Sequence, residues 1–240
     1  ICTMSDKIFV TDPLLIDYAS KYKIDKSKLS WLSLGVPDKK NKDDRNIKLL
    51  NQIINFKTEL SNRYKTKKNI IGLCATGTST KNFHFLFAND LVNQNKDSIS
   101  ASIGLVLIGK FPKEHKFQIA KKEVELNKDI LYINEQFPIN EVFLAPEIDF
   151  LYRTLNDVSV PYSIYVSALI KKPMLTDNYG FLSMMVQKYN LGGVIPESGS
   201  NKVKWLLDTI NNWNPDNADE FLNNRTWLKG AKKIIEASYN

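Results

Sequence analysis

Residues 162–197 read YSIYVSALIKKPMLTDNYGFLSMMVQKYNLGGVIPE and contain the pattern that decides the fold. The first part predicts a helix that opens near Ser163, a favourable capping residue, and ends before Pro173. The remainder predicts, in order, a strand at residues 174–176, an Asn-Tyr-Gly turn, a helix at residues 182–189, and a Gly192-Gly193 turn into a strand at Val194-Ile195. This is one helix-strand-helix-strand unit of an α/β sheet, and we expect its loops to face a ligand at the strand ends.

The same alternation extends over most of the chain. Further strands are predicted at residues 7–12, 29–34, 70–75, 103–108, 130–133 and 148–151. Further helices are predicted at residues 13–22, 47–64, 82–95, 113–126 and 139–144, with two or three more in residues 202–239, divided at Trp213-Asn214-Pro215. Because the strands are apolar without alternation, residues 69–197 predict one parallel sheet of about six strands, covered by helices on both faces. The polar run at residues 38–46 predicts a linker.

Composition excludes several classes of protein. With 240 residues, 43% of them apolar, the chain is long enough to bury a core, so disorder is excluded. The longest apolar runs are far shorter than the ~20 residues that span a bilayer, which predicts a soluble protein or at most a peripheral one. Only Cys2 and Cys74 are present, so we expect a reducing compartment and a cytoplasmic location. The start at Ile1 suggests a piece of a longer protein.

The charge pattern and the motifs narrow the function further. The net charge is +7, but only four of the 33 basic residues are arginines, and no aromatic and basic nucleic-acid module is present. We therefore expect a solvated surface and no nucleic-acid partner. His84 and His115 do not stand at metal-ligand spacing with a cysteine, and neither a G-x-G-x-x-G loop nor a Walker loop occurs. These absences disfavour zinc sites, dehydrogenases and NTPases.

Residues 162–197 resemble the nucleotide-sugar-binding half of GT-B glycosyltransferases, above all family 4, in which a helix of the type S…EA…GKPV precedes a strand, a Gly turn and a GxV strand. Other segments match the family in the expected order. They are residues 7–12 and 28–37 for the bridge between the domains, residues 71–88 with Lys81-Asn82 for the first strand and loop, residues 105–109 for the L-x-IvG strand, and residues 224–239 for the terminal helix.

The resemblance implies a Rossmann-like C-terminal half of a GT-B enzyme, with most of the acceptor-binding domain absent. It divides the chain into residues 1–37, the end of the acceptor domain; 38–68, a linker and helix; 69–200, the nucleotide-sugar-binding domain; and 201–240, C-terminal helices. Residues 1–37 are expected to lie outside the central sheet or at a domain junction.

The chemistry of a nucleotide sugar indicates what the site needs. A diphosphate favours backbone amides at a helix N-terminus, which Tyr162, Ser163 and Ile164 offer, and a cation beside them. Lys81 and Arg153 are the candidate cations, each with an ordinary surface role as the alternative. The expected donor-binding residues are Gly77, Thr78, Lys81, Arg153, Tyr162, Ser163, Ile164, Ser167, Tyr179 and Gly180, while Asp177 and Glu197 are candidates for the ribose hydroxyls.

The departures from the family bear on catalysis. Its paired glutamates would fall on Ser159 and Ser167, which carry no negative charge, and its arginine after the first strand would fall near Thr76. The catalytic residues are therefore left unassigned, and the competence of this chain alone is in doubt.

Three functions stay open. The first is the donor-binding part of a glycosyltransferase that uses a nucleotide sugar, a saccharide or lipid-linked acceptor, and neither metal nor cofactor. The resemblance implies retention of anomeric configuration and a role in polysaccharide or glycoconjugate biosynthesis, with peripheral membrane association left open. The second is a non-catalytic GT-B-like domain that binds a nucleotide or a partner protein. The third is a nucleotide-sugar epimerase.

Overall fold

The computed structural model describes residues 7–19, 23–32, 44–65, 68–75, 91–92, 101–154, 160–196 and 201–238. These residues form two compact units. The larger unit contains the described part of Lys39–Pro215. The smaller unit combines the described parts of Ile1–Asp38 and Asp216–Asn240.

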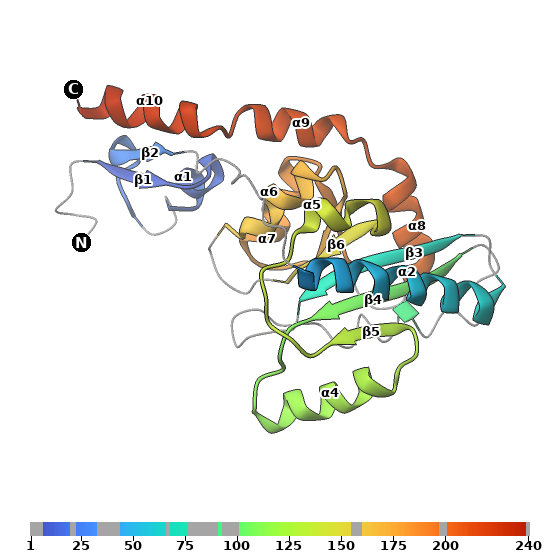
Figure 1. Cartoon of the computed structure of the whole chain (residues 1–240). Helices are drawn as coiled ribbons and strands as arrows, with labels where there is room; N and C mark the ends of the chain where they lie inside the picture. Colours follow the sequence, from blue (N-terminus) through green and yellow to red (C-terminus); the bar gives the residue numbers. More distant parts are fainter. Residues whose placement is uncertain are drawn as a thin grey trace. The chain divides into compact units, whose positions relative to one another are not determined.

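A six-stranded parallel sheet forms the centre of the larger unit (Figure 1). Its spatial order is β5-β4-β3-β6-β7-β8, and every neighbouring pair is parallel. The strands are β3 (Asn69–Ala75), β4 (Ser102–Ile108), β5 (Ile130–Ile133), β6 (Phe150–Tyr152), β7 (Met174–Thr176) and β8 (Gly192–Val194). Along the chain, β4 and β5 follow β3 toward one edge of the sheet. Strand β6 then pairs with the other side of β3, and β7 and β8 continue from it to the opposite edge. This doubly wound, Rossmann-like order confirms the predicted fold class.

Helices cover both faces of this sheet, as the apolar strands predict. The larger unit contains α2 (Asp44–Tyr64), α4 (His115–Leu126), α5 (Glu141–Leu144), the 3-10 helix η4 (Ala145–Glu147), α6 (Tyr162–Leu169), α7 (Gly180–Lys188) and α8 (Lys202–Asn212). On one face, Val124 of α4 and Leu206 of α8 share a buried core with Leu105. On the other face α2 packs against Gly104, where an added Cβ would lie 2.5 Å from Leu60 Cδ1.

The start of α2 corrects the end of the predicted linker at residues 38–46, of which residues 38–43 lie outside the described residues. Asp44 begins the helix, and the acidic side chain in its first turn suits the positive end of the helix dipole. Asn46 is buried: its side-chain amide donates to the Pro138 carbonyl at 3.2 Å, and its Oδ1 accepts from the Asn140 amide at 2.9 Å. These tertiary contacts hold polar residues in a helix that local composition assigns to a linker.

Strand β8 corrects a second expectation. Gly192 and Gly193 lie within the strand and pair with Met174 and Leu175, whereas the sequence pattern predicts a turn followed by a strand at Val194-Ile195. Gly192 has φ 153°, and a Cβ there would lie 2.0 Å from the Met174 carbonyl oxygen. The glycine therefore permits a close approach between two strands instead of forming a turn.

The smaller unit contains a second, two-stranded parallel sheet, so β1 and β2 do not pair within the central sheet. Its elements are β1 (Ile8–Val10), α1 (Pro13–Ala19), the 3-10 helix η2 (Lys26–Lys28), β2 (Leu29–Trp31), α9 (Asp216–Asn223) and α10 (Trp227–Ser238). Asp12 Oδ1 accepts a hydrogen bond from the Leu14 amide. Asp12 Oδ2 accepts a hydrogen bond from Arg225 Nη2 at 2.8 Å. This buried ion pair joins the N-terminal strand-helix-strand to the segment between α9 and α10.

Of the helix predicted at residues 82–95, only Leu91 and Val92 belong to the described residues, and both are helical and buried. In the part of the chain that the structure describes, no helix has the length and apolar character needed to cross a membrane.

Candidate functional site at the carboxyl edge of the sheet

The direction in which successive strands are added to the sheet reverses between β3 and β6. In open α/β sheets, ligands bind outside the carboxyl ends of the strands at such a switch point. Arg153 follows β6 directly, and Cys74 of β3 stands in register with Tyr152 of β6. The candidate cation Arg153 therefore lies at the position where this fold binds ligands.

Arg153 is half-buried, and its Nη1 donates a hydrogen bond to the Tyr152 carbonyl at 3.3 Å. None of the described carboxylates forms an ion pair with it. Burial lowers the pKa of Arg153, whereas Cys74 and Glu141 act in the opposite direction. Burial also raises the pKa of the Cys74 thiol to about 12, so this thiol is neutral near pH 7 and does not neutralise the guanidinium.

The first turn of α6 begins one residue before the expected cap. Pro161, with φ −71° and ψ 132°, is the N-cap residue, and no side chain caps the helix, so Ser163 lies inside the first turn. The Ile164 amide donates to the Pro161 carbonyl at 3.1 Å, so it already has an acceptor. Tyr162 is 40% exposed, and its pKa is raised by burial and by the charge of Glu141. Glu141 therefore acts on both Tyr162 and Arg153.

Ser167 has a structural contact in this chain. Its side chain is buried, and Oγ donates to the Lys172 carbonyl at 2.5 Å. That bond holds the turn between α6 and β7. The hydroxyl is therefore engaged at the end of α6, and no carboxylate stands at this position. Its contact with a donor sugar stays a prediction.

A cluster of polar side chains follows β6 and β7. The Tyr152 hydroxyl donates to Asp177 Oδ1 at 3.1 Å, and both residues are buried. The pKa of Tyr152 lies well above its ordinary value because of burial and then the Asp177 charge. The pKa of Tyr179 is raised by burial and then by its interaction with Asp177, whereas Thr154 acts in the opposite direction. Thr176 Oγ1 is buried with no hydrogen-bond partner among the described residues, which is unusual for a native interior.

The sequence pattern predicts part of this cluster. Asp177 and Tyr179 were expected near the strand ends, but Asp177 is buried and already accepts a hydrogen bond from Tyr152. Tyr152 and Thr176 were missed, although each is the last residue of its strand. The rule that ligands bind at carboxyl strand ends was the signal that could have found them. Gly180 begins α7 with φ 77°, a conformation that glycine adopts without strain.

Four of the expected site residues lie outside the described residues: Gly77, Thr78, Lys81 and Glu197. Ser159, where the resembling family has a glutamate, lies outside them as well. Their contribution stays a prediction. Within the described ranges, no group of three or more His, Cys, Asp and Glu side chains is placed to hold a metal ion.

Solved structures resemble this chain over nearly its whole length. A glycosyltransferase from Rickettsia africae ESF-5 aligns with a TM-score of 0.65 at 14% identity, covering 97% of this chain and 62% of that one. Anabaena Alr3699/HepE in complex with UDP aligns with a TM-score of 0.63 at 12% identity, covering 98% of this chain and 64% of that one. The lipopolysaccharide outer core galactosyltransferase WaaB, in its apo form, aligns with a TM-score of 0.62 at 12% identity, covering 99% of this chain and 62% of that one.

These matches define the class of fold. The chain has the Rossmann-like α/β fold of GT-B glycosyltransferase structures and spans less than two thirds of the length of each, in agreement with one GT-B half. No protein-family model and no curated protein sequence matches the chain.

Proposed function

We propose that this chain is the donor-binding part of a glycosyltransferase and that it binds the diphosphate of a nucleotide sugar at the switch point between β3 and β6. The observation that carries the proposal is Arg153, a half-buried guanidinium at this point with no ion pair to a described carboxylate. A guanidinium presents a planar fork of donors that matches phosphate oxygens. The likeness to HepE in complex with UDP supports a nucleotide diphosphate as the ligand class.

The surroundings of Arg153 suit such a ligand. The first turn of α6 starts at the same edge of the sheet and brings the positive end of its dipole there. The buried Thr176 hydroxyl has no hydrogen-bond partner among the described residues, so a ligand oxygen at the end of β7 would give it one. Lys81, with Gly77 and Thr78, supplies a second predicted cation and further amides.

The Arg153→Met variant tests this assignment. Methionine keeps an apolar stem but removes the charge, so the affinity for UDP-glucose, measured by isothermal titration calorimetry, should fall about tenfold to a hundredfold. Lys188→Met is the matched control, since Lys188 is exposed at the far end of α7. Its affinity should stay at the wild-type value. Unchanged affinity in Arg153→Met, with an unchanged unfolding temperature, would contradict the assignment.

A second candidate is a GT-B-like domain that binds a nucleotide but transfers nothing. Ser167 favours it, because the position that carries a carboxylate in the resembling family holds a hydroxyl already bonded to Lys172. The two candidates differ in how they treat the sugar. A transferase site contacts the sugar, so its affinity for UDP-glucose differs from its affinity for UDP. A domain that contacts only the nucleotide has the same affinity for both.

The remaining parts of the proposal rest on the resemblance. They are transfer with retention to a saccharide or lipid-linked acceptor, in polysaccharide or glycoconjugate biosynthesis. Because the chain spans 62% to 64% of the compared structures, we expect it to bind a donor but to transfer no sugar by itself.

A further inference from the structure

Side chains at the ends of β6 and β7 divide between the two faces of the sheet. Tyr152 pairs in register with Leu175, and both belong to the buried core shared with α4 and α8. The Arg153 amide donates to the Leu175 carbonyl at 3.0 Å, so the pairing continues one residue further. Because successive side chains of a strand alternate between faces, Arg153 and Thr176 point to the opposite face. The cation of the proposed diphosphate site therefore lies on that side of β6.

A second group of polar side chains lies on the face of Tyr152. The Tyr152 hydroxyl donates to Asp177 Oδ1 at 3.1 Å, and Thr154 follows Tyr152 by two residues. Asp177 and Thr154 are each 5% exposed. Burial and Asp177 raise the pKa of Tyr179, the N-cap residue of α7, and Thr154 lowers it, so both side chains lie close to its hydroxyl. We call Thr154, Asp177 and Tyr179 the hydroxyl cluster.

Packing alone does not explain the hydroxyl of Thr154. Its Oγ1 is buried, and no hydrogen bond of normal geometry engages it among the described residues. A buried hydroxyl without a partner destabilises a protein, and valine would fill nearly the same volume without that effect. Tyr179 gives access, because the residue is partly exposed while its hydroxyl is buried. The Thr154 hydroxyl therefore indicates a ligand that reaches the hydroxyl cluster past the Tyr179 ring.

The charges around the hydroxyl cluster indicate the chemistry of that ligand. Asp177 repels an anion, whereas Arg153, the residue before Thr154, disfavours a cation. A ligand hydroxyl suits the cluster, because it donates to a carboxylate and exchanges a hydrogen bond with threonine. A sugar ring with a phosphate attached matches both sides of β6, with the phosphate for Arg153 and the ring hydroxyls for the hydroxyl cluster.

We propose that the hydroxyl cluster binds ring hydroxyls of the sugar next to the diphosphate, which is either the ribose or the transferred sugar. Asp177 accepts a hydrogen bond from the ligand, Thr154 forms a second one, and Tyr152 holds the Asp177 carboxylate in place. This inference rests on the proposed function, because the diphosphate on Arg153 brings the sugar to the end of β6. It adds residues that select the ligand by its hydroxyl groups.

Isothermal titration calorimetry of the whole chain with UDP-glucose, UDP and dideoxyuridine diphosphate tests the proposal. The last ligand has the diphosphate but no ring hydroxyl. Thr154→Val should bind UDP-glucose about threefold to tenfold more weakly than the wild type and bind the dideoxy ligand equally well. Its unfolding temperature without ligand should be unchanged or higher, since a buried hydroxyl without a partner is removed. Asp177→Asn should weaken UDP-glucose binding by about tenfold or more, with the same selectivity.

The UDP measurement identifies the sugar. A loss for UDP as large as the loss for UDP-glucose assigns the hydroxyl cluster to the ribose, and a loss for UDP-glucose alone assigns it to the transferred sugar. An equal loss for the dideoxy ligand, or no loss for any ligand, would overturn the proposal. If the wild type binds none of these ligands, the proposed function fails for uridine donors, and this inference fails with it.

Two other threonines serve as controls. Thr176→Val removes a buried hydroxyl on the Arg153 face, so it should weaken the binding of all these ligands, the dideoxy ligand included. Thr58 is exposed on α2, and its Oγ1 donates to the Ile54 carbonyl at 3.1 Å, so Thr58→Val should change no affinity. The same pattern of losses in Thr154→Val and Thr176→Val would show that the hydroxyl cluster is not a separate subsite.

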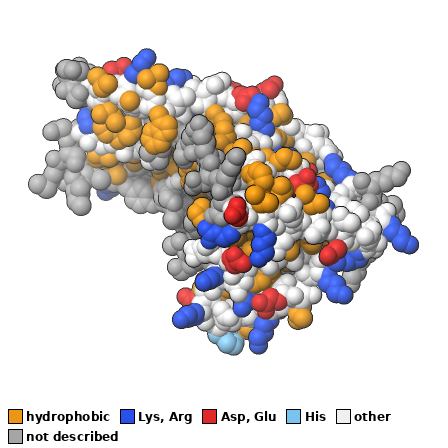
Figure 2. Space-filling view, viewed as in Figure 1, with side chains coloured by type: hydrophobic (Ala, Val, Ile, Leu, Met, Phe, Trp, Pro, Cys, Tyr) orange, Lys and Arg blue, Asp and Glu red, His pale blue; other side chains and the backbone are white. Residues whose placement is uncertain are grey.

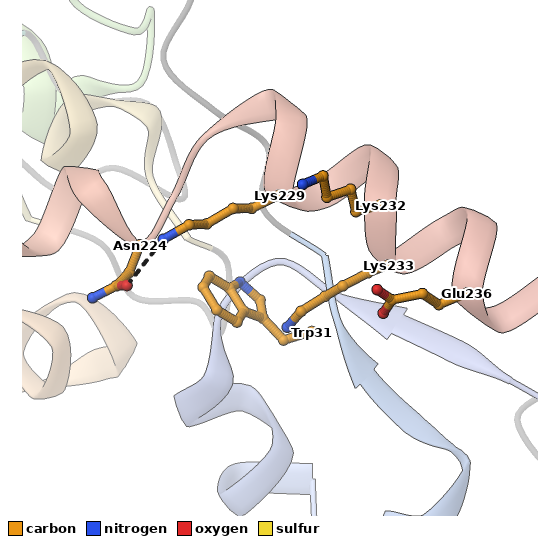
Figure 3. A pocket seen from close by; sticks show the side chains of 6 residues that line it. All are labelled: Trp31, Asn224, Lys229, Lys232, Lys233 and Glu236. Carbon is orange, nitrogen blue, oxygen red and sulfur yellow. Dashed lines mark hydrogen bonds between the residues drawn. The ribbon is translucent and has the colours of Figure 1, made fainter.

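A further control concerns binding elsewhere on the chain. On the face drawn in Figure 2, the described acidic and basic side chains of the larger unit are intermixed. In the smaller unit, a pocket lined by Trp31 and by residues of α10 contains lysines (Figure 3). Lys229 Nζ donates to the Asn223 carbonyl at 2.7 Å, and Lys233 Nζ lies 4.0 Å from the centroid of the Trp31 ring. Lys232→Met, in this pocket, should bind every ligand as the wild type does, and loss of all binding would overturn the proposal.

Discussion

Two of the chain's arginines differ in the way their charge is compensated. Arg225 is 4% exposed, donates to Asp12 Oδ2 through Nε and Nη2, and lies over the Phe221 ring at 3.9 Å. Arg153 is half-buried and has no ion pair with a described carboxylate. A buried charge needs a partner, so the first arginine is structural, while the second retains capacity for an anionic ligand.

The Arg225→Met variant should destabilise the smaller unit by about 3 to 5 kcal/mol, because Asp12 would be left as a buried carboxylate without its cation. Urea denaturation followed by tryptophan fluorescence measures the change. Asp17→Asn is the control, since the Lys26–Asp17 pair is exposed and should contribute at most about 1 kcal/mol. If Arg225→Met lowers the free energy of unfolding by no more than the control does, the buried pair does not stabilise this unit.

The Cys74 thiol should make stability depend on pH above about 9. Its pKa is raised from 9.0 to about 12 by burial, so the folded state holds the proton more tightly than the unfolded state. This contribution is fully present below pH 9 and is lost as pH rises toward 12. Between pH 9 and pH 10 the free energy of unfolding should fall by about 1 kcal/mol more in the wild type than in Cys74→Ala. Parallel pH profiles of the two proteins would refute the assignment.

At the scale of single residues, the sequence predicts which residues lie at the carboxyl edge of the sheet better than it predicts the contacts that they make. Arg153 and Tyr162 lie at the carboxyl edge of the sheet where the pattern puts them, because strand order determines which loops meet there. The cap assigned to Ser163 is wrong, since Pro161 is extended and the helix begins directly after it. The engagement of the Ser167 hydroxyl by Lys172 depends on a backbone path that composition does not encode.

At the scale of elements, the strands with continuous apolar runs were predicted well. Strand β5 agrees in both bounds, and β3 and β4 each agree within one residue. Strands buried on both faces of a sheet are apolar throughout, so their signal does not depend on neighbours. The first residues of α2 and the glycines of β8 were assigned wrongly because tertiary contacts decide them: the bonds of Asn46 and the approach of Gly192 to Met174.

The two glycines of β8 should respond differently to substitution. An added Cβ at Gly192 meets the backbone of Met174 at 2.0 Å, with φ at 153°, so Gly192→Ala should cost about 3 kcal/mol or more of stability. At Gly193 the nearest atoms belong to the side chains of Trp205 and Thr209, both at 2.8 Å, which can shift. Gly193→Ala should therefore cost only about 1 kcal/mol. Thermal unfolding of both variants measures the difference, and equal losses would contradict this view of β8.

At the scale of the whole molecule, the two units were only partly foreseeable. Alternating strands and helices predict the six-stranded sheet, whose order follows the rules for parallel connections. The sequence groups all the C-terminal helices in residues 201–240, whereas α8 belongs to the larger unit and α9 and α10 belong to the smaller one. That division depends on contacts such as Asp12–Arg225, which join residues 213 positions apart, and no local pattern encodes them.

The central claim is that this chain binds a nucleotide-diphosphate sugar, and a thermal-shift panel of UDP-, GDP-, ADP- and dTDP-sugars on the unmodified chain tests it most directly. A ligand that binds only the native state stabilises it by about 2.7 kcal/mol at a hundred times its dissociation constant. We predict that at least one donor raises the unfolding temperature in proportion to the logarithm of its concentration, and that Arg153→Met requires more of that donor for the same rise. No rise with any donor up to millimolar concentrations would contradict the account.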